Sequence, residues 1–203
     1  MAEETPVATI KSRPVYGKLS AQAGAAHLLI ADAEGAAAIV DMAAAAPKDF
    51  FDRAHIIYVP GSAQDRFTAA LQALRPSQFY EGPSIAAALP RLRQTLATAH
   101  MGLRVYLAGT EGLIGQAMQA ALEAGVDHAS IQTEHRGSLA RRVQCVHCKG
   151  VTENVTTQPA TCSHCGLLLL VRDHYSRRIA AFQGVCINAE DPTEEPEKQE
   201  VFR

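Results

Sequence analysis

The sequence of 203 residues predicts an α/β fold in which a parallel-sheet domain is followed by a small zinc ribbon. Short apolar runs alternate with helical ones across residues 27–135, which is typical of a parallel sheet covered on both faces by helices. Two Cys-x-x-Cys pairs then fall within residues 145–165, at the spacing of a metal module. Hydrophobic residues make up 47% of the chain, enough for the core of one medium domain.

The composition divides the chain into four segments. They are an extended N-terminal arm (1–26), the α/β domain (27–135), the four-cysteine module (136–189) and an acidic tail (190–203). The arm mixes prolines, glycine and basic residues without a sustained period, so we expect it to be ordered only where it lies against something. Val15, Tyr16 and Leu19 could pack on the domain or on a partner. The tail is interpreted as a solvated end, or alternatively as a segment that lies across the basic module or a neighbouring subunit.

Within the α/β domain, apolar runs and turn residues predict five strands and four helices. The predicted strands are 27–31, 54–59, 77–80, 103–108 and 129–133. The predicted helices are 34–46, 63–74, 84–100 and 111–124. Pro90 predicts a kink or break in the third helix, and Thr110 is the expected cap of the fourth. Parallel sheets bind ligands beyond the carboxyl ends of their strands, so a site is expected there.

The cysteine pairs predict a closed metal site. Cys145, Cys148, Cys162 and Cys165 form two knuckles whose thiolates can surround one ion as a tetrahedral cage. Structural Zn²⁺ is the preferred ion, and rubredoxin-like iron, which takes the same ligands, is the alternative. Such a cage leaves no open position for water, so it should stabilise the fold and not activate a nucleophile. His147 and His164, between the cysteines of each pair, are expected to point away from the metal, and Cys186 is interpreted as an idle thiol.

A basic segment follows the second knuckle. Arg172, His174, Tyr175, Arg177 and Arg178 are expected on a loop after an apolar strand over residues 167–171. We favour a docking surface for an acidic protein partner. Nucleic-acid binding is the less favoured alternative, because Tyr175 is the only aromatic stacking platform in the segment and the chain as a whole carries a formal charge of −2.

Several function classes are not expected. No apolar run reaches the roughly 20 residues of a membrane span, and the N-terminus lacks the pattern of a secretory leader. Cysteines paired at metal spacing suit a reducing cytoplasm. His27, His55, His100 and His128 lie at element edges and are interpreted as structural. Neither a Ser-His-Asp arrangement nor a paired-carboxylate site can be identified, so no catalytic residue is predicted.

Residues 105–114, with Ala124-Gly125-Val126 and the run Ile131 to Glu134, resemble the end of a ferredoxin-reductase nucleotide domain. The resemblance implies a Rossmann-like strand order, 3-2-1-4-5, and a pyridine-nucleotide pocket. The residues at this pocket are Asp32, Glu34, Gly35, Gly109, Thr110 and Glu111. The glycine-rich first turn of that family is missing, and Asp32 and Glu34 would repel a pyrophosphate there by about 4 kcal/mol per charge pair at 4 Å and an effective dielectric of 20. The pocket is therefore expected to be degenerate, and hydride transfer is not expected.

Longer stretches resemble the DmmA-type subunit of bacterial dimethylamine monooxygenase. The matching stretches are Arg13 to Tyr16, Ala99 to Gly102, Ala108 to Gln116, Thr133 to Ser138, both knuckles, and Val171 to Arg178. The resemblance implies a multi-subunit enzyme that uses O₂ and NADPH to convert dimethylamine to methylamine and formaldehyde. It also implies that heme, FMN and a [2Fe-2S] cluster lie in the partner subunits. This chain is expected to be a structural and docking subunit. The alternative is an electron-transfer subunit that binds the pyridine nucleotide itself.

Overall fold

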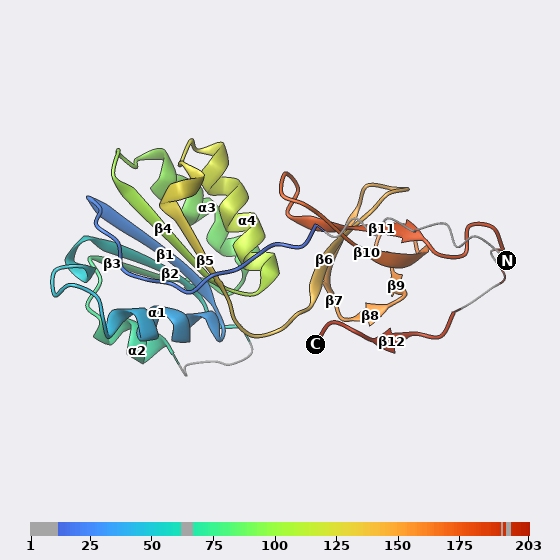
Figure 1. Cartoon of the computed structure of the whole chain (residues 1–203), viewed down its shortest axis with the longest axis horizontal. Coiled ribbons are helices and arrows are strands. Elements are labelled where there is room, and N and C mark those ends of the chain that lie inside the picture. Colours follow the sequence, from blue (N-terminus) through green and yellow to red (C-terminus); the bar gives the residue numbers. More distant parts are fainter. Residues whose placement is uncertain (1–11, 62–66, 192, 194–195) are drawn as a thin grey trace, which may run out of the picture.

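The computed structural model describes residues 12–61, 67–191, 193 and 196–203 and shows two lobes side by side along the long axis (Figure 1). We call residues 26–135 the sheet lobe and residues 141–203 the cysteine lobe. The segment between them, with Gly137 at a positive φ of 84°, carries the chain from one lobe to the other. No helix in the described ranges is both long and apolar enough to cross a lipid bilayer.

The sheet lobe is built on five parallel strands. They are β1 (Ala26–Asp32), β2 (Ala54–Val59), β3 (Gln78–Glu81), β4 (Leu103–Gly109) and β5 (Ile131–His135). Their order is β3-β2-β1-β4-β5, so the α/β parallel sheet and the strand order are as expected. β5 begins two residues later than predicted, because Asp127 accepts a hydrogen bond from Ala129 N and caps a 3₁₀ turn, His128–Ser130.

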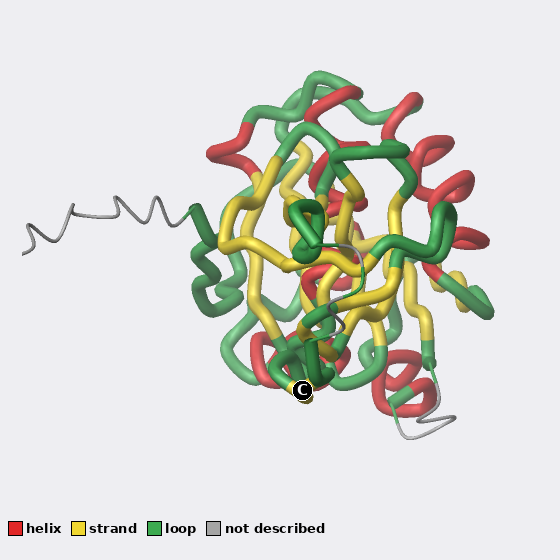
Figure 2. The backbone as a smooth tube through the Cα atoms, turned by 90° about the vertical axis from the view of Figure 1, so that its right-hand side faces the viewer, coloured by secondary structure: helices red, strands yellow, loops and turns green. Residues whose placement is uncertain are grey.

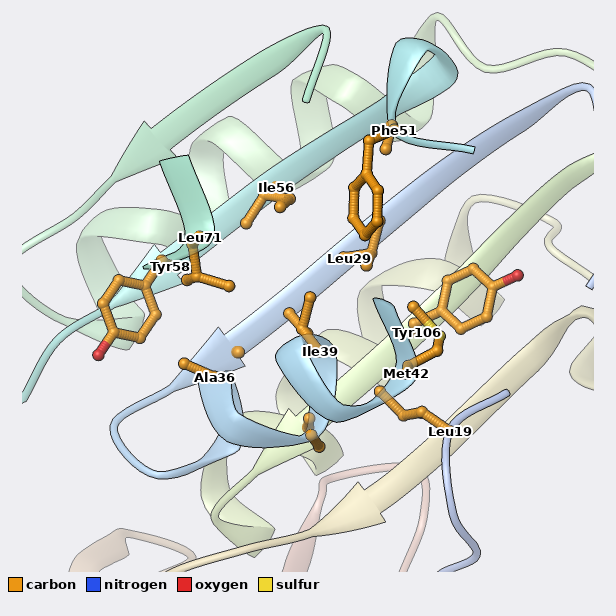
Figure 3. Close-up of a cluster of buried hydrophobic side chains, with 14 of the residues drawn as sticks. Leu19, Leu29, Ala36, Ile39, Met42, Phe51, Ile56, Tyr58, Leu71 and Tyr106 are labelled. Carbon is orange, nitrogen blue, oxygen red and sulfur yellow. The ribbon is translucent and has the colours of Figure 1, made fainter. Parts of the chain in front are cut away.

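Successive residues of the central strands face opposite sides of this sheet, so each side has its own core. Leu29 and Ala31 of β1 belong to one core, together with the buried faces of α1 and α2 (Figure 3). Leu28 and Ile30 belong to the other core, which α3 and α4 cover. Near-continuous burial along β1, β2 and β4 is therefore the reason that these strands read as unbroken apolar runs.

Within the described residues, four helices cover the two faces. They are α1 (Gly35–Ala43), α2 (Thr68–Ala73), α3 (Ile85–Ala97) and α4 (Glu111–Glu123), and a 3₁₀ turn, η1 (Phe51–Arg53), precedes β2. Part of the predicted second helix, residues 62–66, lies outside the described residues. The break expected at Pro90 is absent, because α3 runs through it. The carbonyl of Ala86, which loses its i+4 donor to Pro90, lies on the exposed face, where water can bond it. Thr110 caps α4 as predicted, accepting from Leu113 N.

The cysteine lobe consists of short strands around a small core. Its strands are β6 (Arg141–Cys145), β7 (Val151–Val155), β8 (Thr157–Gln158), β9 (Ala160–Thr161), β10 (Leu168–Ser176), β11 (Ala181–Cys186) and β12 (Gln199–Glu200). The sheet order is β7-β6-β11-β10-β9, with β12 paired to β8. The expected basic loop is mostly strand, which corrects the prediction. β10 continues through a bulge between Val171 and Tyr175, since β11 pairs with it on both sides of that bulge.

The arm from Ser12 onward and the C-terminal tail both contact the lobes. Figure 2 shows the strands of the molecule with helices around them. Along the arm, Leu19 is buried, Tyr16 is half-buried and Val15 is exposed. The tail is not simply solvated: β12 pairs with β8, and the ring of Phe202 is buried in the cysteine lobe. The tail thus lies on its own module through backbone pairing and one aromatic ring.

Candidate metal centre

The two Cys-x-x-Cys turns have the same backbone geometry. In the first, the N–H of Cys145 donates to Gly150 O (2.9 Å), and Lys149 N donates back to Cys145 O (3.0 Å). In the second, Cys162 N donates to Leu167 O (2.9 Å), and Gly166 N to Cys162 O (3.0 Å). Lys149 and Gly166 occupy the same left-handed position, with φ of 64° and 76°. The two turns are therefore equivalent, which is the arrangement that two facing knuckles require.

The four cysteine sulfurs converge on one point. All the sulfur atoms of Cys145, Cys148, Cys162 and Cys165 lie within 4.8 Å of one another. The separations across the knuckles are 3.9 Å between Cys145 and Cys165 and 3.7 Å between Cys148 and Cys162. A tetrahedron with metal–sulfur bonds of 2.3 Å has edges of about 3.8 Å. The donor set and its spacing thus fit one tetrahedral metal ion.

Backbone donors around the sulfurs favour thiolates. Gly150 N donates to Cys148 Sγ at 3.4 Å. Burial opposes ionisation of Cys162, but the backbone N–H groups of Cys165 and His164 outweigh it and lower the pKa of this thiol to about 6. A thiolate is the form that binds metal. The four residues therefore suit Zn²⁺ or Fe²⁺, both of which accept four thiolates.

The histidines of the knuckles have other roles. His147 is exposed, and His164 Nε2 lies 3.0 Å from Val151 O, which fixes its ring against β7. A Cβ at Gly150 would collide with the His164 ring, so that position needs glycine. Cys186 lies outside the cluster, and its Sγ donates to Asn188 Oδ1 (3.4 Å). These three residues are not ligands in this arrangement.

A hydrogen-bonded side chain bridges the carboxyl ends of β1 and β4. The order β3-β2-β1-β4-β5 places the switch point, where such sheets bind ligands, between these two strands. Asp32 is buried there and accepts from Thr110 N (2.8 Å) and Thr110 Oγ1 (2.6 Å). Burial raises the pKa of Asp32, and the Thr110 hydrogen bonds oppose that rise. A Cβ at Gly109 would strike Asp32 Oδ1, so glycine is required at this contact.

The other residues predicted near this pocket have separate positions. Gly35 lets α1 approach β4, because a Cβ would collide with Ala108 O. Glu111 accepts a hydrogen bond from Tyr16 of the arm (3.1 Å), and Glu34 is the residue before α1. Asp32 and Thr110 line a cavity of about 580 Å³ between this edge and the β6–β7 hairpin, where Arg142 and Glu153 also lie. The crevice therefore remains open as a cavity, with Asp32 and Thr110 in its wall.

The basic segment on β10 and its turn divides into exposed and supporting residues. Arg172, His174, Arg177 and Arg178 are exposed. Tyr175 is half-buried, with its ring edge-on to Phe182 at 5.0 Å. A Cβ at Gly115 of α4 would meet Tyr175 Oη and Ala180, so the hairpin turn lies directly on the sheet lobe. Tyr175 thus lies at the contact between the two lobes.

Sequence patterns missed the ion pairs that hold the lobes and arm together. Glu134 is buried, and it accepts from Leu19 N (2.7 Å) and from Arg136 Nε (2.8 Å). Asp173 binds both Arg13 of the arm and Arg141 of β6. These contacts show that several arginines around the cysteine module are paired internally.

Two family models and individual relatives match the chain. The model described as "Dimethylamine monooxygenase subunit DmmA-like, N-terminal domain" matches residues 8–131, and the corresponding C-terminal domain matches residues 142–185. The heme-dependent oxidative N-demethylase delta subunit of Ectopseudomonas mendocina (strain ymp) is 32% identical over 143 residues, covering 68% of this chain and 82% of that protein. Among solved structures, flavohemoglobin from Malassezia yamatoensis with bound FAD and heme aligns with a TM-score of 0.36 and 16% identity. That alignment covers 56% of this chain and 32% of flavohemoglobin.

Proposed function

The chain belongs to the dimethylamine monooxygenase subunit DmmA-like family, and from this premise we propose that it is a structural and docking subunit of an oxidative N-demethylase complex. The complex would oxidise dimethylamine to methylamine and formaldehyde with O₂ and NADPH. A heme-bearing subunit and a reductase subunit with FMN and a [2Fe-2S] cluster would be the partners. In this proposal the present chain holds those partners at electron-transfer distance and performs no chemistry itself.

The observation that carries the structural role is the convergence of the four cysteine sulfurs. All four lie within 4.8 Å of one another, so one ion would use every donor and keep no open coordination position. We propose structural Zn²⁺ there, with iron as the alternative. The ion would fix the β6–β7 and β9–β10 turns and, through them, the shape of the β10–β11 hairpin. It would neither activate water nor carry electrons.

The proposed docking surface is the exposed part of the basic segment: Arg172, His174, Arg177 and Arg178. No ion pair involves these arginines within the described ranges, whereas Arg136, Arg141 and Arg142 are paired. Unpaired guanidinium groups on a rigid hairpin suit an acidic surface of a partner protein. Tyr175 would contribute by fixing the hairpin to α4.

Co-purification of the chain with its candidate heme and reductase partners tests this proposal. Cys148→Ser or Cys162→Ser should lose the metal and then the complex, while the matched Cys186→Ser should lose neither. Arg177→Glu with Arg178→Glu should keep the metal and lose the complex, and Arg93→Glu on α3 is the control for a charge reversal elsewhere on the surface. A cysteine variant that lacks metal yet forms an active complex would contradict the docking role. Elemental analysis separates zinc from iron.

A second function, NADPH binding by the sheet lobe, is favoured by the cavity of about 580 Å³ at the carboxyl edge of the sheet. Against it, Asp32 occupies the switch point and would place a carboxylate beside the pyrophosphate. Calorimetric titration of the purified chain with NADPH distinguishes the two functions. Micromolar binding would make the chain an electron-transfer subunit, and its absence is the outcome that we expect.

A further inference from the structure

A second cavity lies at the opposite edge of the parallel sheet. Its volume is about 440 Å³, within the range of small-molecule sites, and it lies where β1, β2 and β4 begin, beside the second half of α3. His27, His55, Arg53, Arg91 and His100 line it. This is the edge away from the crevice of Asp32 and Thr110, so neither the docking role nor NADPH binding accounts for it.

Unsatisfied polar atoms gather at this cavity. Within the described ranges, three buried side-chain nitrogen or oxygen atoms have no hydrogen-bond partner: His27 Nδ1, His55 Nε2 and Arg91 Nε. All three belong to residues that line this one cavity. The side chains of His27 and His55 are more than nine-tenths buried, at 2% and 7% exposure. Buried polar groups are nearly always paired, so three unpaired nitrogens around one cavity indicate a missing ligand.

The charge of the lining indicates an anion. No aspartate or glutamate is among the described residues around the cavity. Arg53 is already paired with Asp49 at 2.9 Å. Arg91 donates to the neutral Gln78 at 3.0 Å, and it has no ion pair with any residue that the structure describes. The guanidinium carbon of Arg91 also lies 5.9 Å from the centroid of the Tyr80 ring, but no described carboxylate neutralises its charge, and an oxyanion would do so.

The hydrogen bond between His55 and Thr95 narrows the choice of anion. Because Thr95 Oγ1 donates its single proton to Arg91 O (3.0 Å), we assign His55 Nδ1 as the donor in its 3.3 Å contact with Thr95 Oγ1. Neutral His55 then presents an acceptor at Nε2. The ligand must consequently offer a proton at His55 and acceptor oxygens at Arg91. A carboxylate lacks that proton, whereas a phosphate group with a P–OH has both.

We propose that this cavity binds a phosphate group, either inorganic phosphate or a phosphate monoester, between Arg91 of α3 and the imidazoles of His27 and His55. One proton is shared between the phosphate and His55. Arg91 supplies the charge, and His27 orients the ligand from β1.

The pKa shifts of His55 and His27 agree with a proton that is shared between His55 and the phosphate. Burial lowers the pKa of His55 to about 4, and Arg91 adds to this effect. Burial, with Arg53 and Arg104, also lowers the pKa of His27, while Asp49 opposes the shift. Both rings are therefore neutral at pH 7. The second pKa of a phosphate monoester is about 6, so this ligand can still bring a proton near neutrality, whereas sulfate cannot.

Calorimetric titration of the full chain with inorganic phosphate, a phosphate monoester, sulfate and acetate tests the proposal. We expect phosphate to bind more tightly than sulfate at pH 7, and the sulfate affinity to rise as the pH falls. The tighter binding of either inorganic phosphate or the monoester shows which of the two is the ligand. Equal affinities for phosphate and sulfate, preferential binding of acetate, or no heat at millimolar phosphate would each overturn the assignment.

Two variants and a matched control locate the site. Arg91→Gln should weaken phosphate binding by about tenfold or more, because a charge-assisted hydrogen bond is lost. Arg93→Gln, on the same helix but outside the lining, should leave it unchanged. His55→Asn retains a donor toward Thr95 and removes Nε2, so it should abolish the preference for phosphate over sulfate. If either variant fails to fold, imidazole NMR signals of the native chain provide the test: phosphate must shift those of His27 and His55, and unchanged signals contradict the proposal.

Discussion

The two lobes of this chain obtain their stability in different ways. The sheet lobe buries most side chains of β1, β2 and β4 between two layers of helices. The cysteine lobe has one small core, and two of its members, Cys145 and Cys162, are the buried cysteines of the cluster. A core of that size rarely folds alone, so metal binding and folding are coupled in such modules. We therefore expect a sheet lobe that is stable on its own and a cysteine lobe whose folding depends on the proposed metal.

Metal removal should produce the largest difference in stability between the two lobes. Structural zinc contributes about 10–16 kcal/mol in small modules, which is more than the cysteine lobe can lose and remain folded. We expect a chelator to abolish amide-exchange protection in β6, β10 and β11 while β1 and β4 stay protected. Cys162→Ser should have the same effect, and Cys186→Ser should have none. Simultaneous loss of protection in both lobes would contradict their independence.

Truncation of a core side chain in the sheet lobe should instead destabilise that lobe and leave metal binding unchanged. Leu29, in β1, is completely buried, and Leu29→Ala should destabilise the sheet lobe by about 2–5 kcal/mol through the cavity that it leaves. Urea unfolding followed by circular dichroism measures this loss, and the metal content should not change. The matched variant is Leu169→Ala, which truncates an equally buried leucine of the cysteine lobe. Its effect should appear mainly as weaker metal binding, because the metal and that core fold together.

Acidification should weaken each lobe through a different group. Burial holds the pKa of His55 at about 4, whereas an unfolded chain titrates near 6.5, so the unfolded state takes up the proton first. The sheet lobe should therefore lose stability as the pH falls from about 6.5 to 4, by roughly 2 kcal/mol for this residue. His55→Asn should flatten that part of the profile and leave stability at pH 8 nearly unchanged. The cysteine lobe should instead lose its metal as the thiolates protonate.

The sheet lobe was predictable from sequence because its signals are local. Unbroken apolar runs marked β1, β2 and β4, and turn residues separated them from the helices. The spacing of the cysteines likewise predicted which four sulfurs converge. Pro90 is an exception. The sequence predicted a kink or break there, but α3 continues through this exposed position.

What the sequence could not predict depends on contacts between distant segments. The basic residues after Val171 read as a loop, because nothing local indicated that β11 would pair with them beyond a bulge. The hydrogen-bonded bridge from Asp32 across the switch point needs Thr110, which is 78 residues away. The acidic tail gave no sign that Phe202 would enter a core. Charge counts also overstate a free basic surface, since Arg141 and Arg142 are paired internally.

Weakening the attachment of the tail should have the smallest effect on stability, and a neighbouring residue provides a matched control. Arg141 lies between two rings, with its guanidinium carbon 4.0 Å from the centroid of Phe182 and 4.1 Å from that of Phe202. Phe202→Leu keeps an apolar side chain and removes one ring face, so the cysteine lobe should lose about 1 kcal/mol. Val201→Ala, at a half-exposed neighbouring position, should change nothing measurable. Thermal unfolding of the metal-loaded chain compares the two. Equal stability in both variants would mean that β12 alone holds the tail and that the ring contributes nothing to the metal-dependent lobe.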